Sequence, residues 1–346
     1  MDREEVRSRG WVLKAYAPRG NLTSEHLELR ETILDVGSLP ENHVAVKALW
    51  ISVEPYLRAK MYGRDVGLCA TQCPLNQVVK WYGIGEVLRS NSPIYGNGDI
   101  VLNPFLSLSE YSVAPAEIIH KVDSDAGIPL HEYLGTLGIA GFSAWVGVNE
   151  VGQVKAGENV FISAAAGGVG IIAGQLAKIK GCRVIGSAGT DEKVKLLKEE
   201  LGYDDAFNYK KEKDFDAALS KYFPDGIDVY LDNVGGKMLE AVLNHINNGA
   251  RIPISGMVSQ YTQVWTERDG VRNLLNLVGK EAKMQGFLIR SYLHLLPVFT
   301  AEMIGYMKQG KLKTKHKIYE GIEYLLESLN AIFSGINTGK VAIKVL

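Results

Sequence analysis

The chain has 346 residues, 46% of them hydrophobic and 22% charged, with a formal net charge of −1 at pH 7. This composition is typical of a globular protein of about two domains, and the near-zero charge excludes a general attraction to nucleic acid or to a membrane surface. The first ten residues lack the apolar stretch of a secretion signal, and three cysteines are too few for a disulfide framework. We therefore expect a cytoplasmic protein.

The N-terminal part of the chain, residues 11–130, is predicted to be rich in β-strands. Apolar and β-branched residues dominate short segments such as 44–53 and 110–113, and glycines and prolines separate these segments. We expect a barrel or sandwich domain here.

Residues 160–177 have a different pattern, an apolar strand that leads through small residues into a helix. The small residues follow the spacing Ala164-x-x-Gly167-x-x-Gly170, a variant of G-x-G-x-x-G. Without side chains in the way, the pyrophosphate of a dinucleotide can approach the N-terminus of the helix. An Ala/Gly-rich helix packed closely on a sheet is the structural alternative. A membrane span is rejected, because the segment contains four glycines and is shorter than the ~20 apolar residues that a bilayer requires.

Strands and helices alternate in the following part of the chain, which predicts a doubly wound parallel sheet. We expect a dinucleotide-binding Rossmann domain over residues 135–300, and a catalytic domain made of residues 1–134 and 301–346, to which the last strand returns. Pro253 lies within a predicted central strand, where it removes a hydrogen-bond donor, so we expect a short strand or a bulge there. The predicted strands are 183–187, 227–231, 250–255, 284–289 and 340–345, and the predicted helices are 191–201, 215–222, 239–246, 296–308 and 322–333.

The residues after the second strand of this domain favour NADPH over NADH. An NAD-binding domain has an acidic residue ~20 positions after the glycines, whereas residues 187–190 read Ser-Ala-Gly-Thr. Lys193 and Tyr209 could bind a 2′-phosphate, although a solvated lysine and a packing tyrosine would look the same. Asp191 could reverse the preference by binding the ribose itself.

No metal site is predicted. Cys69 and Cys73 lack further ligands at a suitable spacing, and the seven histidines are scattered singly. Polarisation of a substrate carbonyl would therefore come from hydroxyl groups.

Several motifs in a fixed order resemble the zinc-independent medium-chain dehydrogenase/reductases, in particular plant NADPH-dependent 2-alkenal (double-bond) reductases and animal prostaglandin/leukotriene reductases. The resemblance implies a GroES-like β-rich catalytic domain, a Rossmann domain and a homodimer. It also implies reduction by NADPH of a C=C bond conjugated to a carbonyl. The motifs are residues 53–58, 134–138, 186–194, 204–210, 232–236, 255–261 and 337–340.

The resemblance also implies site residues. Tyr261 is the first candidate for a hydroxyl donor to the developing enolate, and the ribose hydroxyl of the cofactor could share this task. Tyr82 and Tyr56 are the next candidates, and each of the three tyrosines has pocket lining as the alternative role. The implied cofactor contacts are Gly167, Gly168, Val169, Gly170, Ser187, Gly189, Lys193, Tyr209, Asn233, Ser255, Gly256, Met257, Ser259, Tyr261, Phe287, Leu288, Ile289 and Asn337.

The sequence departs from the family pattern on the substrate side, at residues 81–83, 101–107 and 139–145. Aromatic residues such as Trp50 and Trp145 favour a bulky apolar enone or enal, although some of them must belong to the core. A zinc-free quinone reductase and an NADPH-binding protein without turnover are the alternative functions.

Overall fold

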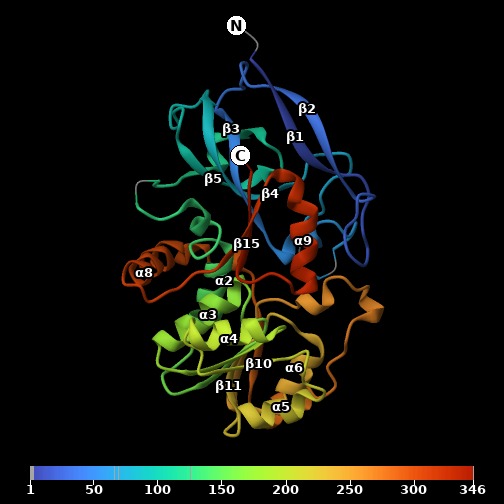
Figure 1. Cartoon of the computed structure of the whole chain (residues 1–346), viewed down its shortest axis with the longest axis vertical. Helices are drawn as coiled ribbons and strands as arrows, with labels where there is room; N and C mark the ends of the chain where they lie inside the picture. The colour runs from blue at the N-terminus through green and yellow to red at the C-terminus, as the bar shows by residue number, and fades with distance from the viewer. Residues whose placement is uncertain (1–3, 66, 69, 125, 346) are drawn as a thin grey trace. The chain divides into compact units, whose positions relative to one another are not determined.

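The computed structural model describes residues 4–65, 67–68, 70–124 and 126–345 and separates into two compact units. The first unit comprises the residues up to Leu134 together with Lys317–Ile336 and the residues from Val341 onwards, and the second comprises Gly135–His316 and Asn337–Lys340 (Figure 1). Each unit has a hydrophobic core of its own. Cys69, one of the residues considered as a metal ligand, lies outside the described residues.

The first unit is built on antiparallel strands, as expected from its alternating apolar residues. β1 pairs with β2 in a two-stranded sheet, and the larger sheet has the order β14-β15-β3-β4-β5-β7, with β6 also paired to β3. Its strands are β1 (Glu5–Leu13), β2 (Leu27–Asp35), β3 (His43–Val53), β4 (Lys80–Ser90), β5 (Ile100–Ser107), β6 (Tyr111–Pro115), β7 (His120–Lys121), β14 (His316–Glu320) and β15 (Lys340–Lys344), and its helices are α1 (Pro55–Ala59) and α9 (Leu325–Ser334).

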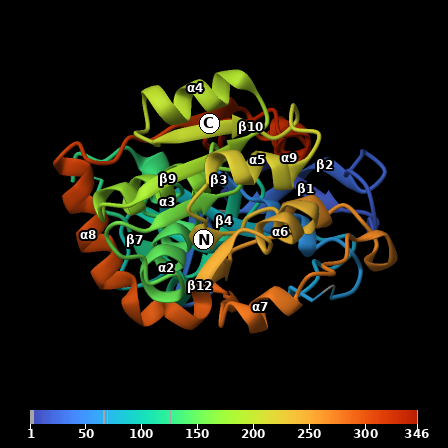
Figure 2. The ribbon, with the colours of Figure 1, turned by 90° about the horizontal axis from the view of Figure 1, so that it is seen from below.

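The second unit is a doubly wound sheet of six parallel strands in the order β10-β9-β8-β11-β12-β13. Helices α2, α3 and α4 cover one face of this sheet, and α5 and α6 cover the other (Figure 2). The strands are β8 (Asn159–Ile162), β9 (Arg183–Ala188), β10 (Asp205–Asn208), β11 (Ile227–Leu231), β12 (Ile246–Ile254) and β13 (Lys283–Gly286), and the helices are α2 (Ile139–Val146), α3 (Gly168–Ile179), α4 (Asp191–Glu199), α5 (Phe215–Tyr222), α6 (Gly236–Val242), α7 (Leu275–Gly279) and α8 (Leu296–Lys308).

The second unit extends beyond residue 300, where the sequence placed its end, because α8 packs on α2. The rings of Phe299 and Phe142 lie 4.9 Å apart, and the indole Nε1 of Trp145 donates to Glu302 at 2.8 Å. Trp145 is thus a core residue of this unit. Further along, Gln175 of α3 exchanges two hydrogen bonds with the backbone of Lys313, at 2.8 and 2.9 Å. The chain therefore returns to the first unit after His316.

Two other expectations are corrected locally. The helical stripe predicted to reach Ile246 ends earlier, since α6 stops at Val242 and Ile246 begins β12. β12 continues through Pro253, and its pairing with β11 is irregular, with a shift of register between Ile227 and Val229. Pro253 itself pairs in regular register with Gln285 of β13, so the short strand or bulge expected at the proline is not found there.

The helix α3 lies close to the sheet because glycines face the ring of Tyr203. A Cβ built on Gly174 would lie 2.1 Å from the Tyr203 hydroxyl, and one on Gly186 would lie 2.5 Å from Cβ of Ala165. The Tyr203 hydroxyl donates to the carbonyl of Gly170 at 2.7 Å, so this ring connects the first turn of α3 to β9. Burial raises the pKa of Tyr203, which keeps this donor protonated.

No helix in the described part of the chain is both long and apolar enough to cross a lipid bilayer.

Replacement of Gly174 by alanine should destabilise the protein, since the new methyl group would collide with the buried ring of Tyr203. Overpacking of this kind costs about 1–3 kcal/mol, which should lower the melting temperature by several degrees. Gly305→Ala is the matched control, because it lies within α8 with nothing within 4 Å of the new Cβ. Alanine in an open helix position should stabilise by up to about 1 kcal/mol. Equal shifts of the two variants in circular-dichroism melts would contradict this packing argument.

Candidate functional site

The N-terminus of α3 presents backbone donors that no side chain satisfies. Gly167 is the N-cap residue, has no side-chain cap and forms an isolated parallel bridge with Gly339. Within the described residues the amides of Val169 and Gly170 have no hydrogen-bond acceptor outside the helix. Ala164, in the turn before the helix, adopts a positive φ of 47°. Free N–H groups and the positive end of the helix dipole form a suitable place for phosphate oxygens. The structure thus brings the four predicted pyrophosphate residues, 167–170, together in one turn.

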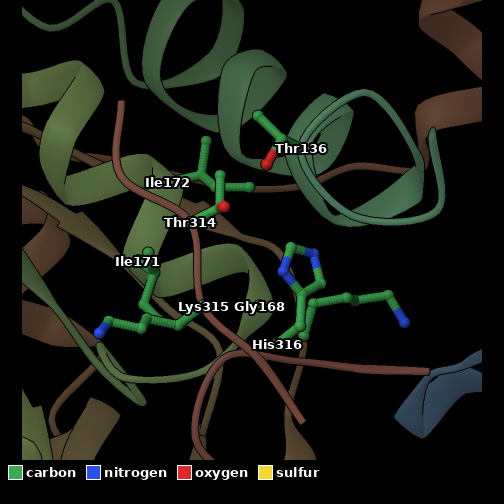
Figure 3. A pocket seen from close by; sticks show the side chains of 8 residues that line it. Thr136, Gly168, Ile171, Ile172, Thr314, Lys315 and His316 are labelled. Carbon is green, nitrogen blue, oxygen red and sulfur yellow. The ribbon is translucent and has the colours of Figure 1, made fainter. Parts of the chain in front are cut away.

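A small cavity lies beside this turn within the second unit (Figure 3). It is lined by residues that include Thr136, Gly168, Ile172, Thr314 and His316, and its volume is about 10 Å³. This is about the space of one water molecule. The cavity is therefore too small to hold a nicotinamide or an organic substrate.

Lys193 lies one turn into α4, where the Thr190 hydroxyl caps the helix by accepting the Lys193 N–H at 3.3 Å. The lysine is only 8% exposed, and its Nζ donates to the carbonyl of Asn337 at 2.6 Å. Burial and the nearby Lys210 both lower the pKa of Lys193. The two predicted cofactor residues Lys193 and Asn337 are thus in direct contact.

Gly189 is partly exposed and lies next to the side chains of Tyr209 and Lys210. A Cβ at Gly189 would lie 3.3 Å from the Tyr209 hydroxyl and 3.4 Å from Cε of Lys210. Ser187, by contrast, is buried within β9, and its carbonyl accepts the N–H of Ala165 at 2.9 Å. Two ammonium groups and a phenol near a glycine form a donor set that fits a phosphate dianion.

Asp232 follows β11 and is fully buried. Its Oδ1 accepts hydrogen bonds from Tyr230 at 2.7 Å, from Ser163 at 3.2 Å and from the amides of Val234 and Gly235 at 2.8 and 2.9 Å. Its Oδ2 is buried with no hydrogen-bond partner in the part of the chain that the structure describes. Burial raises the pKa of Asp232, and the two amides and two hydroxyls oppose that shift.

The carboxyl ends of β8, β11 and β12 meet around this carboxylate. The amide and the side chain of Asn233 donate to Oγ and to the carbonyl of Ser163 at 3.0 and 2.8 Å. The amides of Ser255 and Gly256 both donate to the carbonyl of Asp232 at 2.8 and 3.1 Å. In doubly wound sheets ligands bind outside the carboxyl ends of the strands. The structure therefore places the predicted residues Asn233, Ser255 and Gly256 at that edge.

The segment from Met257 to Tyr261 is folded back on this edge. Ser259 donates through Oγ to the carbonyl of Val234 at 2.6 Å. The amide of Met257 donates to the Tyr261 hydroxyl oxygen at 3.2 Å, which holds this buried phenol beside Gly256. Residues 287–289 follow β13 and are half-buried, and the Phe287 ring meets Tyr292 edge-on at 6.4 Å.

Tyr56 and Tyr82 belong to the first unit. The Tyr56 ring stacks on Trp81 with the centroids 6.0 Å apart, and its hydroxyl donates to the carbonyl of Leu68 at 3.1 Å. Trp81 donates through Nε1 to the buried Glu54 at 2.6 Å. Burial and the proximity of Glu54 raise the pKa of Tyr82, whose hydroxyl has no hydrogen-bond partner within the described residues. Of these two tyrosines, Tyr82 has the hydroxyl that is free to donate.

Ser163 and Asp232, which organise this edge of the sheet, were not among the site residues predicted from the sequence. Both are polar residues directly after apolar strands, and this pattern at the carboxyl ends of parallel strands is the signal that could have identified them. Neither residue was assigned because their contact joins residues 69 positions apart.

Two family models match the chain. The model described as N-terminal domain of oxidoreductase matches residues 9–122, and the model described as Zinc-binding dehydrogenase matches residues 168–303. The first match lies within the β-rich unit and the second within the unit that contains the parallel sheet.

The chain is also similar over its whole length to known reductases. It is 41% identical to the 2-alkenal reductase (NADP(+)-dependent) of Nicotiana tabacum, over 99% of this chain and 98% of that protein. It is 41% identical to the (+)-pulegone reductase of Mentha piperita, over 96% of this chain and 97% of that protein. The crystal structure of CurA from Vibrio vulnificus in complex with NADPH superposes with a TM-score of 0.88, at 31% identity, over 98% of this chain and 99% of CurA.

The buried Asp232 predicts how stability depends on pH. Since burial raises its pKa, the folded protein retains this proton at pH values at which the unfolded chain has lost it. Stability from this group is thus greatest below the ordinary aspartate pKa of about 3.9 and decreases as the pH rises through the folded value. Asp232→Asn is neutral at every pH, and its amide oxygen can still accept the four hydrogen bonds.

In thermal melts at a series of pH values between about 4 and 8, the melting temperature of Asp232→Asn should therefore rise relative to that of the wild type as the pH increases. A difference that is constant or decreases over this range would show that the carboxyl is not destabilised by burial.

Proposed function

Because the chain belongs to the medium-chain dehydrogenase/reductase family, with 2-alkenal and prostaglandin reductases among its relatives, we propose that it reduces the C=C bond of α,β-unsaturated aldehydes and ketones with NADPH. The observation that carries this proposal is the full-length similarity to a reductase named for NADP(+)-dependent action on 2-alkenals.

The geometry of the second unit supports NADPH as the cofactor. The uncapped first turn of α3 supplies N–H donors for the pyrophosphate, and Lys193, Tyr209 and Lys210 form a cationic group for the 2′-phosphate. Asn233 and the segment 255–261 lie at the strand ends where the nicotinamide half would bind.

The chemistry that bound NADPH supplies is hydride transfer to the β-carbon of the conjugated double bond. As this carbon accepts the hydride, negative charge develops on the carbonyl oxygen of the substrate. The protein must then present a hydroxyl donor to that oxygen, since a preorganised donor stabilises developing charge more effectively than mobile water does. A proton then adds to the α-carbon.

We propose Tyr261 as the donor to the carbonyl oxygen. The amide of Met257 fixes its oxygen, and its place directly after Ser255 and Gly256 puts it on the segment assigned to the nicotinamide. Tyr82 is the second candidate, because its raised pKa keeps its phenol protonated. The Tyr56 hydroxyl already donates to a backbone carbonyl, which makes this residue better suited to lining the pocket through its ring.

We also propose that the protein is a homodimer. β13 is the edge strand of the six-stranded sheet, and its Met284 is 37% exposed. Leu275 and Val278 on the preceding helix α7 are 77% and 75% exposed. An open strand edge beside exposed apolar residues is a suitable surface for pairing with a second copy of the chain.

The function is tested by following the loss of NADPH absorbance with a 2-alkenal, a cyclic enone, a benzoquinone and no acceptor. The alkenal and the enone should support turnover, and mass spectrometry should identify the saturated carbonyl compound as product. Faster turnover with the quinone would favour a quinone reductase. NADPH binding without turnover on any acceptor would favour a non-catalytic protein.

Tyr261→Phe should reduce kcat on an enone by ~10²–10³, since it removes a hydroxyl that stabilises developing charge in the transition state. Tyr82→Phe provides the comparison in steady-state assays. Tyr306→Phe is the matched control, because the Tyr306 hydroxyl donates to Glu302 on the same helix. A Tyr261→Phe enzyme that keeps kcat within about a factor of two would exclude this role, because a lost oxyanion donor has a far larger effect. A large loss in Tyr82→Phe alone would move the role to Tyr82.

A further inference from the structure

The carboxylate of Asp191, the first residue of α4, is held by two partners, one at the end of β10 and one in the turn that follows it. Oδ1 accepts a hydrogen bond from Nδ2 of Asn208 at 2.9 Å, and Oδ2 forms an ion pair with the Lys211 ammonium. These contacts lower the pKa of Asp191, so the carboxyl remains ionised. Each oxygen of this carboxylate therefore has a partner in the segment 208–211.

The turn that supplies these partners is itself well ordered by hydrogen bonds. Asn208 accepts the amide of Lys210 through Oδ1 at 3.1 Å, and its carbonyl accepts the amide of Lys211 at 3.0 Å. The amide of Tyr209 donates to the carbonyl of Ala188 at 3.0 Å, which ties the turn to β9. Asn208 and Lys211 are thus fixed relative to the start of α4.

The position of Asp191 matters because an acid near the end of the second strand is the group that selects the unphosphorylated cofactor. Such a carboxylate accepts hydrogen bonds from the ribose hydroxyls, and it repels a 2′-phosphate. Asp191 lies two residues before Lys193, which is close to Lys210. Released from its partners, the carboxylate would lie beside the cationic group assigned to that phosphate.

We propose that Asn208 and Lys211 determine the cofactor preference by holding the Asp191 carboxylate away from the adenine ribose. This inference rests on the proposed function, since it concerns the same NADPH site. It assigns Asn208 and Lys211 as positioning residues, which act through Asp191 and do not bind the nucleotide themselves. Glu192, the other acid in the first turn of α4, forms hydrogen bonds with its own backbone and with the side chain of Thr190.

The test is to measure by titration calorimetry how tightly the full chain binds adenosine 2′,5′-bisphosphate and adenosine 5′-monophosphate. Wild type should prefer the bisphosphate, and Lys193→Ala should lose most of that preference. Lys211→Met should weaken bisphosphate binding about fivefold, the size expected for repulsion between exposed charges a few ångströms apart in water. Binding of the monophosphate should not weaken.

The decisive variant is Lys211→Met combined with Asp191→Asn. If the freed carboxylate causes the loss, removing its charge should restore bisphosphate binding to the wild-type value. Lys213→Met is the matched control, because it removes the same charge from an exposed lysine that has no acidic partner in the described chain.

Three results would overturn the inference. One is unchanged bisphosphate binding in Lys211→Met, and another is an equal loss in Lys213→Met. The third is a loss that Asp191→Asn does not restore, since Lys211 would then bind the phosphate directly. Each of these leaves the proposed function intact, whereas a wild-type protein without preference for the bisphosphate would overturn both.

Discussion

The close approach of α3 to the parallel sheet is the constraint on which the rest of the second unit depends. Gly174 and Gly186 leave room for the ring of Tyr203, and the Tyr203 hydroxyl binds the carbonyl of Gly170 in the first turn of the helix. This contact fixes where the helix begins relative to the strand ends. The free N–H groups at that start are therefore held in place by packing on the far side of the helix, and the phosphate site is a consequence of that packing.

A second device fixes the edge of the sheet where the nicotinamide half would bind. The buried carboxylate of Asp232 accepts hydrogen bonds from two amides of its own turn and from two hydroxyls. The backbone carbonyl of Asp232 accepts hydrogen bonds from two amides of the turn after β12. A buried polar network of this kind specifies one arrangement of the loops, because any other arrangement leaves its donors unsatisfied. Oδ2 of this carboxyl is buried without a hydrogen-bond partner among the described residues, which lowers the stability of the folded protein. The network thus fixes the loop geometry at some expense of stability.

Charged side chains gather at the other end of the proposed dinucleotide site, where the 2′-phosphate would bind. Lys193 is buried and donates to a carbonyl, and Lys210 has no acidic partner among the described residues. Asp191, a nearby acid that could oppose these two lysines, is bound by Lys211. The same short turn after β10 supplies Tyr209, Lys210 and Lys211. Cofactor choice would thus depend on a turn that lies outside the glycine-rich motif.

The sequence by itself determined the features that depend on local spacing. The strand, glycine turn and helix of residues 160–177 and the alternation of strands and helices could both be predicted, because side-chain periodicity and turn chemistry act over a few residues. Local patterns also placed α8 at its observed bounds.

Only the tertiary structure decided what depends on contacts between distant segments. It assigned α8 to the second unit through its packing on α2, and it joined Ser163 to Asp232 across 69 residues. It also showed the partners of Asp191, which lie 17 and 20 residues further along the chain. No local pattern encodes such contacts, because they arise from the order in which the strands pair and from the helices that this order brings together.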